Sequence, residues 1–126
     1  MTARNIYGTS YIFMRTIIVD GAASQRRILS LLLETESSVP AEAFDTPASA
    51  APFSQDDRVF LDAAFPPDSV HPAAVITTGS VKQDELLAQR IREGAATFLV
   101  KPYTRETLLR ALNEAALLTA IEGAPA

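Results

Sequence analysis

The fold of this chain is decided by a stretch near its C-terminal end, Gly94-Ala95-Ala96-Thr97-Phe98-Leu99-Val100-Lys101-Pro102-Tyr103. Its centre, residues 98–100, is an apolar run typical of a buried strand, and Lys101 ends that run. Lys101 is one of only two lysines in the chain. A cation at the end of a buried parallel strand lies at the carboxyl edge of the sheet, where open α/β folds place their ligand sites. We therefore expect Lys101 to belong to a functional site.

Three other apolar runs also end in polar side chains. These are Asp20 after residues 16–19, Asp62 after residues 59–61 and Thr78 after residues 73–77. The carboxyl ends of parallel strands meet at one edge of a sheet, so we expect these side chains to lie near Lys101. Two carboxylates, a hydroxyl and an ammonium group at one edge indicate a site of the phosphoryl-acceptor type.

Composition limits the class of protein. The 126 residues, 48% hydrophobic and 21% charged, suit one domain with one core. A net charge of −4, with no basic cluster longer than Arg26-Arg27, argues against direct binding of nucleic acid or an anionic membrane. Cysteine is absent, which excludes a disulfide framework and a thiol nucleophile. No apolar run reaches the ~18 residues of a membrane span and no signal peptide is evident, so we expect a cytoplasmic protein.

Short β-branched runs alternate with helical stretches, which predicts βαβ units and a parallel sheet. The expected helix signals are a cap at Ser24 for the first helix, a capping box of Ser80 and Gln83 before the helix at 81–93, a stop at Gly94, a cap at Thr104 and an end at Gly123.

The middle of the chain is rich in proline. A strand at 39–44 is expected, followed by at most a short helix within 46–54. The connection from Ala63 to Pro72 has ten residues, three of them proline, which is too short for a normal crossover helix. We therefore expect an uncovered sheet face near Phe65 and Val70, shielded by a partner or a second copy. The alternative surface for binding a partner or a second copy is the face formed by the last strand and the last two helices. His71, the only histidine, is expected to be solvated.

Four segments resemble the receiver domains of bacterial two-component response regulators, the CheY-like family. They are residues 17–20 followed by 26–29, the D-x-x-x-P turn of 60–66, the strand 75–79, and the stretch 94–103, which is the most specific. The resemblance covers Arg15 to Leu118. It implies a three-layer, doubly wound, five-stranded parallel sheet with the helix between strands 3 and 4 missing or reduced. Residues 14–122 would form this domain, with an extra arm at 1–13 and a tail at 123–126.

The resemblance also implies roles for individual residues. Asp62 would be the phosphoacceptor, Lys101 the cation that pairs with the phosphoryl group, and Thr78 the hydroxyl that moves to bond it. Phe98 would be the switch aromatic, although by residue type alone plain core is the commoner role. Mg²⁺ would be held by the metal-binding set of Asp20, Asp62 and the carbonyl of Ala64. The family normally has a second acid after the first strand, and Gly21 stands there, so we expect weak metal binding.

The resemblance favours a non-enzymatic signalling function. The expected partners are a histidine kinase or phosphotransfer protein, an output protein, and a second copy of the chain. The alternative is a pseudo-receiver, a docking or dimerisation module independent of phosphate, as in antiterminator and pilus-assembly proteins. A third reading is an aspartate-nucleophile phosphatase, but Ala64 stands where such enzymes need a second aspartate.

Overall fold

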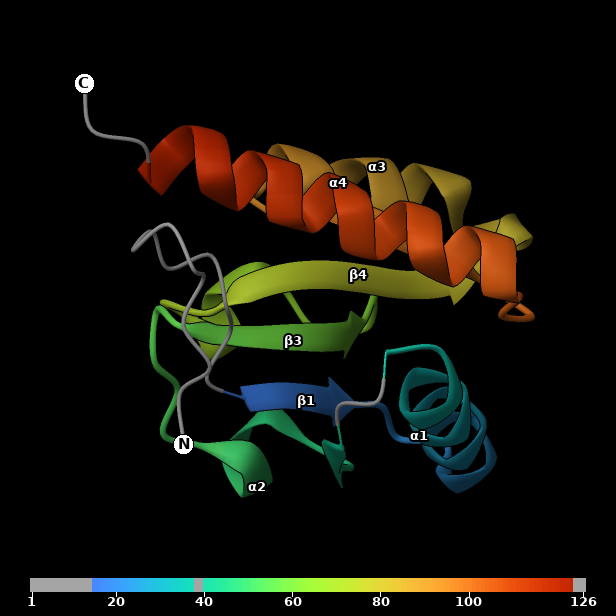
Figure 1. The fold of residues 1–126 in the computed structure, drawn as a ribbon. Helices are drawn as coiled ribbons and strands as arrows, with labels where there is room; N and C mark the ends of the chain where they lie inside the picture. The colour runs from blue at the N-terminus through green and yellow to red at the C-terminus, as the bar shows by residue number, and fades with distance from the viewer. Residues whose placement is uncertain (1–14, 38–39, 124–126) are drawn as a thin grey trace.

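A computed structural model describes residues 15–37 and 40–123 (Figure 1). The expected N-terminal arm, and the last three residues of the expected tail, lie outside the described residues. Five parallel strands form one sheet in the order β2-β1-β3-β4-β5. The strands are β1 (Arg15–Val19), β2 (Ala41–Phe44), β3 (Asp57–Asp62), β4 (Ala74–Ser80) and β5 (Thr97–Lys101). The expected doubly wound α/β fold is confirmed.

Helical segments cover both faces of the sheet. The α-helices are α1 (Ala23–Ser37), α2 (Pro47–Ala50), α3 (Asp84–Arg92) and α4 (Arg105–Gly123), and the 3₁₀ turns are η1 (Pro67–Val70) and η2 (Val81–Gln83). One core cluster joins α1 and α4 to the sheet and contains Ile18, Leu29, Leu33, Phe60, Ile76, Leu99, Leu108, Ala111 and Ala115. On the opposite face, a second cluster contains Ile17, Val19, Ala50, Val59, Leu61, Val70, Val75 and Ala95. Figure 1 shows α3 lying behind α4.

Most of the expected helix signals are confirmed. Ser80 and Gln83 form a capping box, in which the Gln83 side chain accepts from the Ser80 N–H at 2.9 Å. Gly94 has φ of +119°, a backbone conformation that favours glycine, and it follows the end of α3. The Thr104 hydroxyl accepts from the N–H of Thr107 at 3.1 Å at the start of α4, which ends at Gly123 as expected.

The predicted cap at Ser24 is wrong. Helix α1 begins at Ala23, so Ser24 lies inside its first turn. Before the helix, the carboxylate of Asp20 accepts from the N–H of Ala22 at 2.8 Å. The turn into α1 is therefore held by a residue of the candidate site rather than by a serine cap.

The crossover between β3 and β4 is reduced to η1, as expected, but the prediction of an uncovered face is wrong. Val70 is fully buried, and Phe65 is half-buried against the same cluster. Pro67 is also buried. The short connection places its own apolar side chains on the sheet, so this surface needs no partner to cover it.

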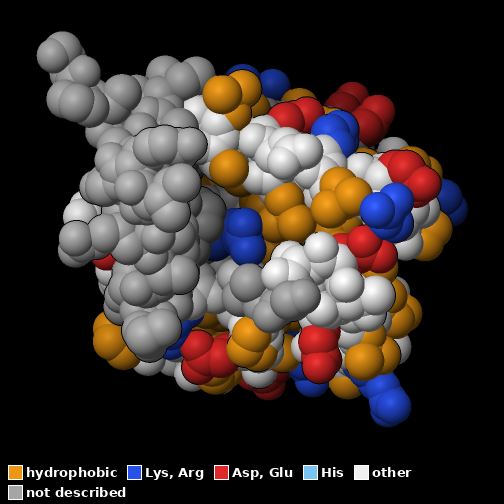
Figure 2. All heavy atoms as spheres, in the orientation of Figure 1, with side chains coloured by type: hydrophobic (Ala, Val, Ile, Leu, Met, Phe, Trp, Pro, Cys, Tyr) orange, Lys and Arg blue, Asp and Glu red, His pale blue; other side chains and the backbone are white. Residues whose placement is uncertain are grey.

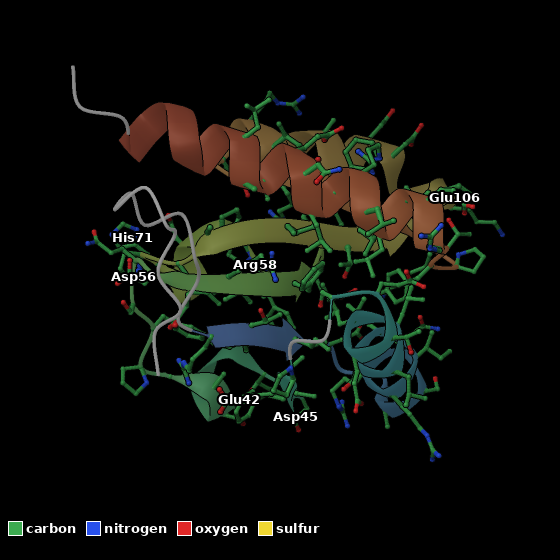
Figure 3. The ribbon with its side chains drawn as sticks, in the orientation of Figure 1. Glu42, Asp45, Asp56, Arg58, His71 and Glu106 are labelled. Atoms are coloured by element: carbon green, nitrogen blue, oxygen red, sulfur yellow. The ribbon has the colours of Figure 1, made fainter. Side chains whose placement is uncertain are left out.

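No helix of the described residues is long and apolar enough to cross a membrane. Figure 2 shows acidic and basic side chains interspersed on the visible face, without a broad field of one sign. His71 is exposed, as expected, and Figure 3 shows it at the same end of the molecule as Asp56. It lies in the segment that leads into β4, at the amino edge of the sheet, opposite the strand ends that carry the candidate site.

Candidate functional site

The strand register brings the predicted site residues to one edge of the sheet. Asp62, the last residue of β3, is paired with Thr78 of β4, and Lys101 ends the neighbouring strand β5. Asp20 directly follows β1, on the other side of β3. Because all strands are parallel, these four side chains share the carboxyl edge, as the sequence predicts.

Lys101 joins the two carboxylates. Its Nζ donates to Asp20 Oδ2 at 2.8 Å and to Asp62 Oδ1 at 2.9 Å. The other oxygen of each carboxylate accepts a backbone N–H, Asp20 Oδ1 from Ala22 at 2.8 Å and Asp62 Oδ2 from Ala64 at 3.2 Å. Every oxygen of the carboxylate pair therefore has a donor, which fixes the orientation of both side chains.

The electrostatics of the site favour a permanently charged lysine. Burial alone would lower the pKa of Lys101, but the hydrogen bonds to Asp20 and Asp62 outweigh burial and raise it above its ordinary value. Lys101 is thus a fixed cation beside Asp62 at neutral pH. Such a cation stabilises negative charge that develops on an oxyanion held next to the carboxylate.

Thr78 and Tyr103 complete the inner side of the site. Thr78 is buried, and the Tyr103 phenol lies near both Thr78 and Lys101. Burial raises the pKa of Tyr103 to about 12, although the charge of Lys101 opposes this shift. From the sequence, Tyr103 was noted only as the last residue of the stretch 94–103, with no role assigned to it. Its position two residues after Lys101 was the available signal for a place in the site.

Phe98 is not plain core, contrary to the reading from residue type alone. Its side chain is 38% exposed. The guanidinium carbon of Arg110, from α4, lies 4.6 Å from the centre of the Phe98 ring, a cation–π contact. On β5, Thr97 and Leu99 are buried, whereas Phe98 points to the other face of the sheet, where cover is incomplete.

An apolar groove lies beside Phe98. It has a volume of about 580 Å³ and is lined by Val81, Asp84, Leu87, Ala88, Ile91, Phe98 and Val100. Three of its large apolar side chains are markedly exposed, with fractions of 70% for Val81, 37% for Ile91 and 38% for Phe98. This surface, formed by α3 and β5, coincides with the alternative surface that the sequence suggested, not with the face near Phe65.

The carboxylates of Asp20 and Asp62 are of the kind that can serve as magnesium ligands. Mg²⁺ is commonly held by one or two carboxylates together with water, and Asp20 and Asp62 provide two. The carbonyl of Ala64 is the third expected ligand. No group of three or more acidic, histidine or cysteine residues within residues 15–37 and 40–123 is placed to hold a metal. Gly21 is exposed, and a Cβ added there would meet no atom within 4 Å, so a carboxylate side chain could be accommodated at this position.

Two arginines that the sequence did not single out contact the backbone of the site. Arg26 Nη1 donates to the carbonyl of Asp20 at 2.6 Å. Arg90 Nε donates to the carbonyl of Ala63, the residue after Asp62, at 2.9 Å. Arg26 is in the helix that follows Asp20, so its proximity could have been inferred, but nothing local in the sequence connects Arg90 to Ala63.

Comparisons with known proteins agree with this architecture. No protein-family model matches the sequence, and no curated protein matches it significantly. Among solved structures, the N-terminal signal receiver domain of a two-component response regulator from Bacteroides fragilis aligns with a TM-score of 0.67 and 24% identity, over 81% of this chain and 95% of that domain. A response regulator receiver domain protein from Clostridium thermocellum aligns with a TM-score of 0.68 and 18% identity, over 86% and 98% respectively.

NtrX from Brucella abortus aligns with a TM-score of 0.69 and 20% identity, over 88% of this chain but only 28% of its own length. In that longer protein the shared part is therefore a minor segment. At these identities the likeness concerns the fold, which agrees with the order of the five parallel strands described above. The chain has the fold of response-regulator receiver domains.

Proposed function

We propose that this chain acts in two-component signal transduction as a receiver-type signalling domain, in which Asp62 accepts a phosphoryl group. The observation that carries the proposal is the double contact of Lys101 with Asp20 and Asp62 at the carboxyl edge. An Asp62 oxygen would bond to phosphorus as the bond from phosphorus to a phosphohistidine nitrogen breaks, and the imidazole takes up a proton. Lys101 would then pair with the oxygens of the transferred group.

A magnesium ion held by Asp20, Asp62 and the carbonyl of Ala64 would assist this step. The ion would screen the negative charge that the incoming phosphoryl group brings against two carboxylates. Since Gly21 supplies no ligand, a higher magnesium concentration would be needed than for a site with three acids. The donor of the phosphoryl group would be a histidine kinase or a phosphotransfer protein.

Output would proceed through protein binding at the groove between α3 and β5. Its lining is apolar apart from Asp84, which disfavours an anionic ligand such as a nucleic acid. Exposed apolar side chains around a groove are typical of protein interaction sites. An output protein or a second copy of the chain would bury Val81, Ile91 and Phe98, which are costly to leave in water.

The second candidate is a pseudo-receiver that docks without phosphorylation. Two observations favour it: Gly21 stands where the family has a ligand acid, and Lys101 pairs directly with both carboxylates. In this case Lys101 would hold the strand ends together and the groove alone would carry the function.

Intact mass spectrometry after incubation with acetyl phosphate and magnesium separates the two candidates. We expect one phosphoryl adduct that is lost in Asp62→Asn and retained in Asp56→Asn, which removes an exposed carboxylate at the other edge of the sheet. The absence of an adduct at millimolar donor and magnesium would reject the phosphoacceptor and leave the pseudo-receiver. An adduct that persists in Asp62→Asn would place the acceptor elsewhere.

A further inference from the structure

The carbonyl of Ala63 is a buried acceptor that its own segment cannot satisfy. Ala63 follows Asp62 directly and is fully buried. Turns and helices normally satisfy a carbonyl with the N–H three or four residues later, and these positions are Pro66 and Pro67, which have no N–H. A buried carbonyl requires a partner, so the donor has to come from another element.

That donor is Arg90, near the end of α3. Its Nε donates to the carbonyl of Ala63 at 2.9 Å, while its Nη1 pairs with Glu93 at 2.8 Å. The Arg90 side chain is only 13% exposed. Glu93 also accepts from Gln89 at 3.0 Å, so the carboxylate that orients the guanidinium is itself held. The planar fork of arginine makes both contacts at once, which the single ammonium of a lysine cannot reproduce with the same geometry.

The peptide after Asp62 is therefore held from two sides. The N–H of Ala63 donates to the carbonyl of Thr78 at 2.8 Å, and its carbonyl accepts from Arg90. The main chain of Arg90 is fixed as well, because its carbonyl accepts from the buried Ala95 at 3.0 Å. A displacement of the turn after Asp62 consequently acts on α3 through one rigid side chain.

Helix α3 is also a wall of the groove. Leu87, one turn before Arg90, and Ile91, the next residue, both line it. The contact between Arg90 and Ala63 therefore connects the turn after the candidate phosphoacceptor with the surface that would bind a partner. A second path runs through β4 and β5, in which Thr78 lies beside Leu99 and Gly79 beside Val100. It also reaches α3 at Leu87, whose side chain lies against Gly79, so Ile91 is the more specific readout for Arg90.

We infer that Arg90 couples the turn after Asp62 to the groove, so that a change at Asp62 moves α3 and a partner in the groove changes the turn in return. The inference rests on the proposed function, since it names how the acidic site would regulate the groove. The contact joins two groups of this chain, so it can be tested by substitution alone.

The test uses methyl NMR of the full chain, with Asp62→Ala as the perturbation. We expect Asp62→Ala to shift the methyl resonances of Leu87 and Ile91 in the wild-type background. Arg90→Gln should reduce these shifts by about threefold or more. The matched control is Arg92→Gln, which removes the same charge from an exposed position of the same helix and should leave the shifts unchanged.

Readouts on β5 and a second variant make the result specific. The methyls of Val100 should respond to Asp62→Ala in all backgrounds, because they report the path through the strands. If Arg90→Gln does not fold, Arg90→Lys replaces it, with Asp62→Asn as the milder perturbation. Equal shifts at Leu87 and Ile91 with and without Arg90, or no shift in the wild-type background, would overturn the coupling.

Failure of the proposed function gives a different result. If no phosphoryl adduct forms but Arg90→Gln removes the response of Leu87 and Ile91, the coupling through Arg90 is supported and the phosphoacceptor role of Asp62 is rejected. If the adduct forms but the α3 response does not depend on Arg90, the proposed function is supported and the coupling through Arg90 is rejected.

Discussion

Replacing Lys101 by methionine should destabilise the fold, because it leaves two carboxylates at the same strand edge without their cation. Lys101 Nζ lies 2.8 Å from Asp20 and 2.9 Å from Asp62. The exposed side-chain fractions are 18% for Lys101, 6% for Asp20 and 17% for Asp62. The three groups are thus mostly removed from water, and methionine keeps the apolar stem but none of the charge.

The size of the effect lies between two limits. Removing one member of a fully buried ion pair costs about 3–5 kcal/mol, whereas an exposed pair contributes about 0–1 kcal/mol. Two carboxylates lose their partner here, and water still reaches part of Asp62. We expect Lys101→Met to lower the free energy of unfolding by about 2–4 kcal/mol at pH 7.

The pH dependence has a definite sign. The pKa of Lys101 is raised in the folded protein, so its contribution is complete below the ordinary lysine pKa of about 10.4 and decreases only as pH rises beyond it. At neutral pH the wild type therefore has the full contribution. The loss caused by Lys101→Met should therefore be the same at pH 7 and pH 9, because Lys101 stays charged in the wild type at both values.

Urea unfolding followed by far-UV circular dichroism at pH 7 and pH 9 measures the loss. Lys82→Met is the matched control, because Lys82 is the only other lysine and is exposed, so its change should stay within about 0.5 kcal/mol. Adding Asp62→Asn to Lys101→Met should recover part of the stability. If Lys101→Met costs no more than Lys82→Met at pH 7, or if most of its cost has disappeared at pH 9, the argument from ion pairing is refuted.

Three further predictions follow from the geometry. Gly21→Asp, whose new side chain meets open space, should tighten magnesium binding by roughly 1–3 kcal/mol in a calorimetric titration, and equal affinity would show that position 21 does not face the metal. Val70→Ala should cost about 2 kcal/mol in urea unfolding, since Val70 is fully buried, and a change below 0.5 kcal/mol, on the scale of surface substitutions, would contradict the covered face. Phe98→Glu should abolish any self-association seen by sedimentation, whereas charge reversal at the exposed Asp56 should not; an unchanged assembly would remove the groove as its interface.

The sheet and the site were predictable because they depend on local pattern. Apolar runs that each end in a polar residue imply strands, and parallel strands bring their ends to one edge. Asp20, Asp62, Thr78 and Lys101 required no information beyond these runs. Helix ends were predictable where a glycine or a capping box fixes the backbone. The prediction failed at Ser24, because the Asp20 carboxylate holds the turn before the helix instead.

Cover of the sheet was harder to predict, because it depends on where irregular segments fold back. The proline-rich crossover has no period from which burial can be inferred, yet it buries Val70 completely. Phe98 shows the reverse case, since a large aromatic on a strand is usually buried but β5 is an edge strand whose second face is only partly covered. Arg58 is another residue whose burial the pattern of residue types does not predict. This charged side chain of β3 is half-buried on the sheet (Figure 3), and its Nη2 donates to Thr16 at 3.1 Å.

Arg90 marks the boundary between what local sequence determines and what only the fold determines. The sequence shows that the carbonyl of Ala63 has no backbone N–H donor three or four residues later, because Pro66 and Pro67 lack an N–H. The need for a donor from another element could therefore be predicted from the sequence. The sequence does not contain the donor's identity, since any of several side chains at the carboxyl edge could reach this position. Only the packing of α3 against β4 brings Arg90 to it, 27 positions along the chain. The same proline-rich segment that shortens the crossover thus makes the turn after Asp62 depend on the helix that lines the groove.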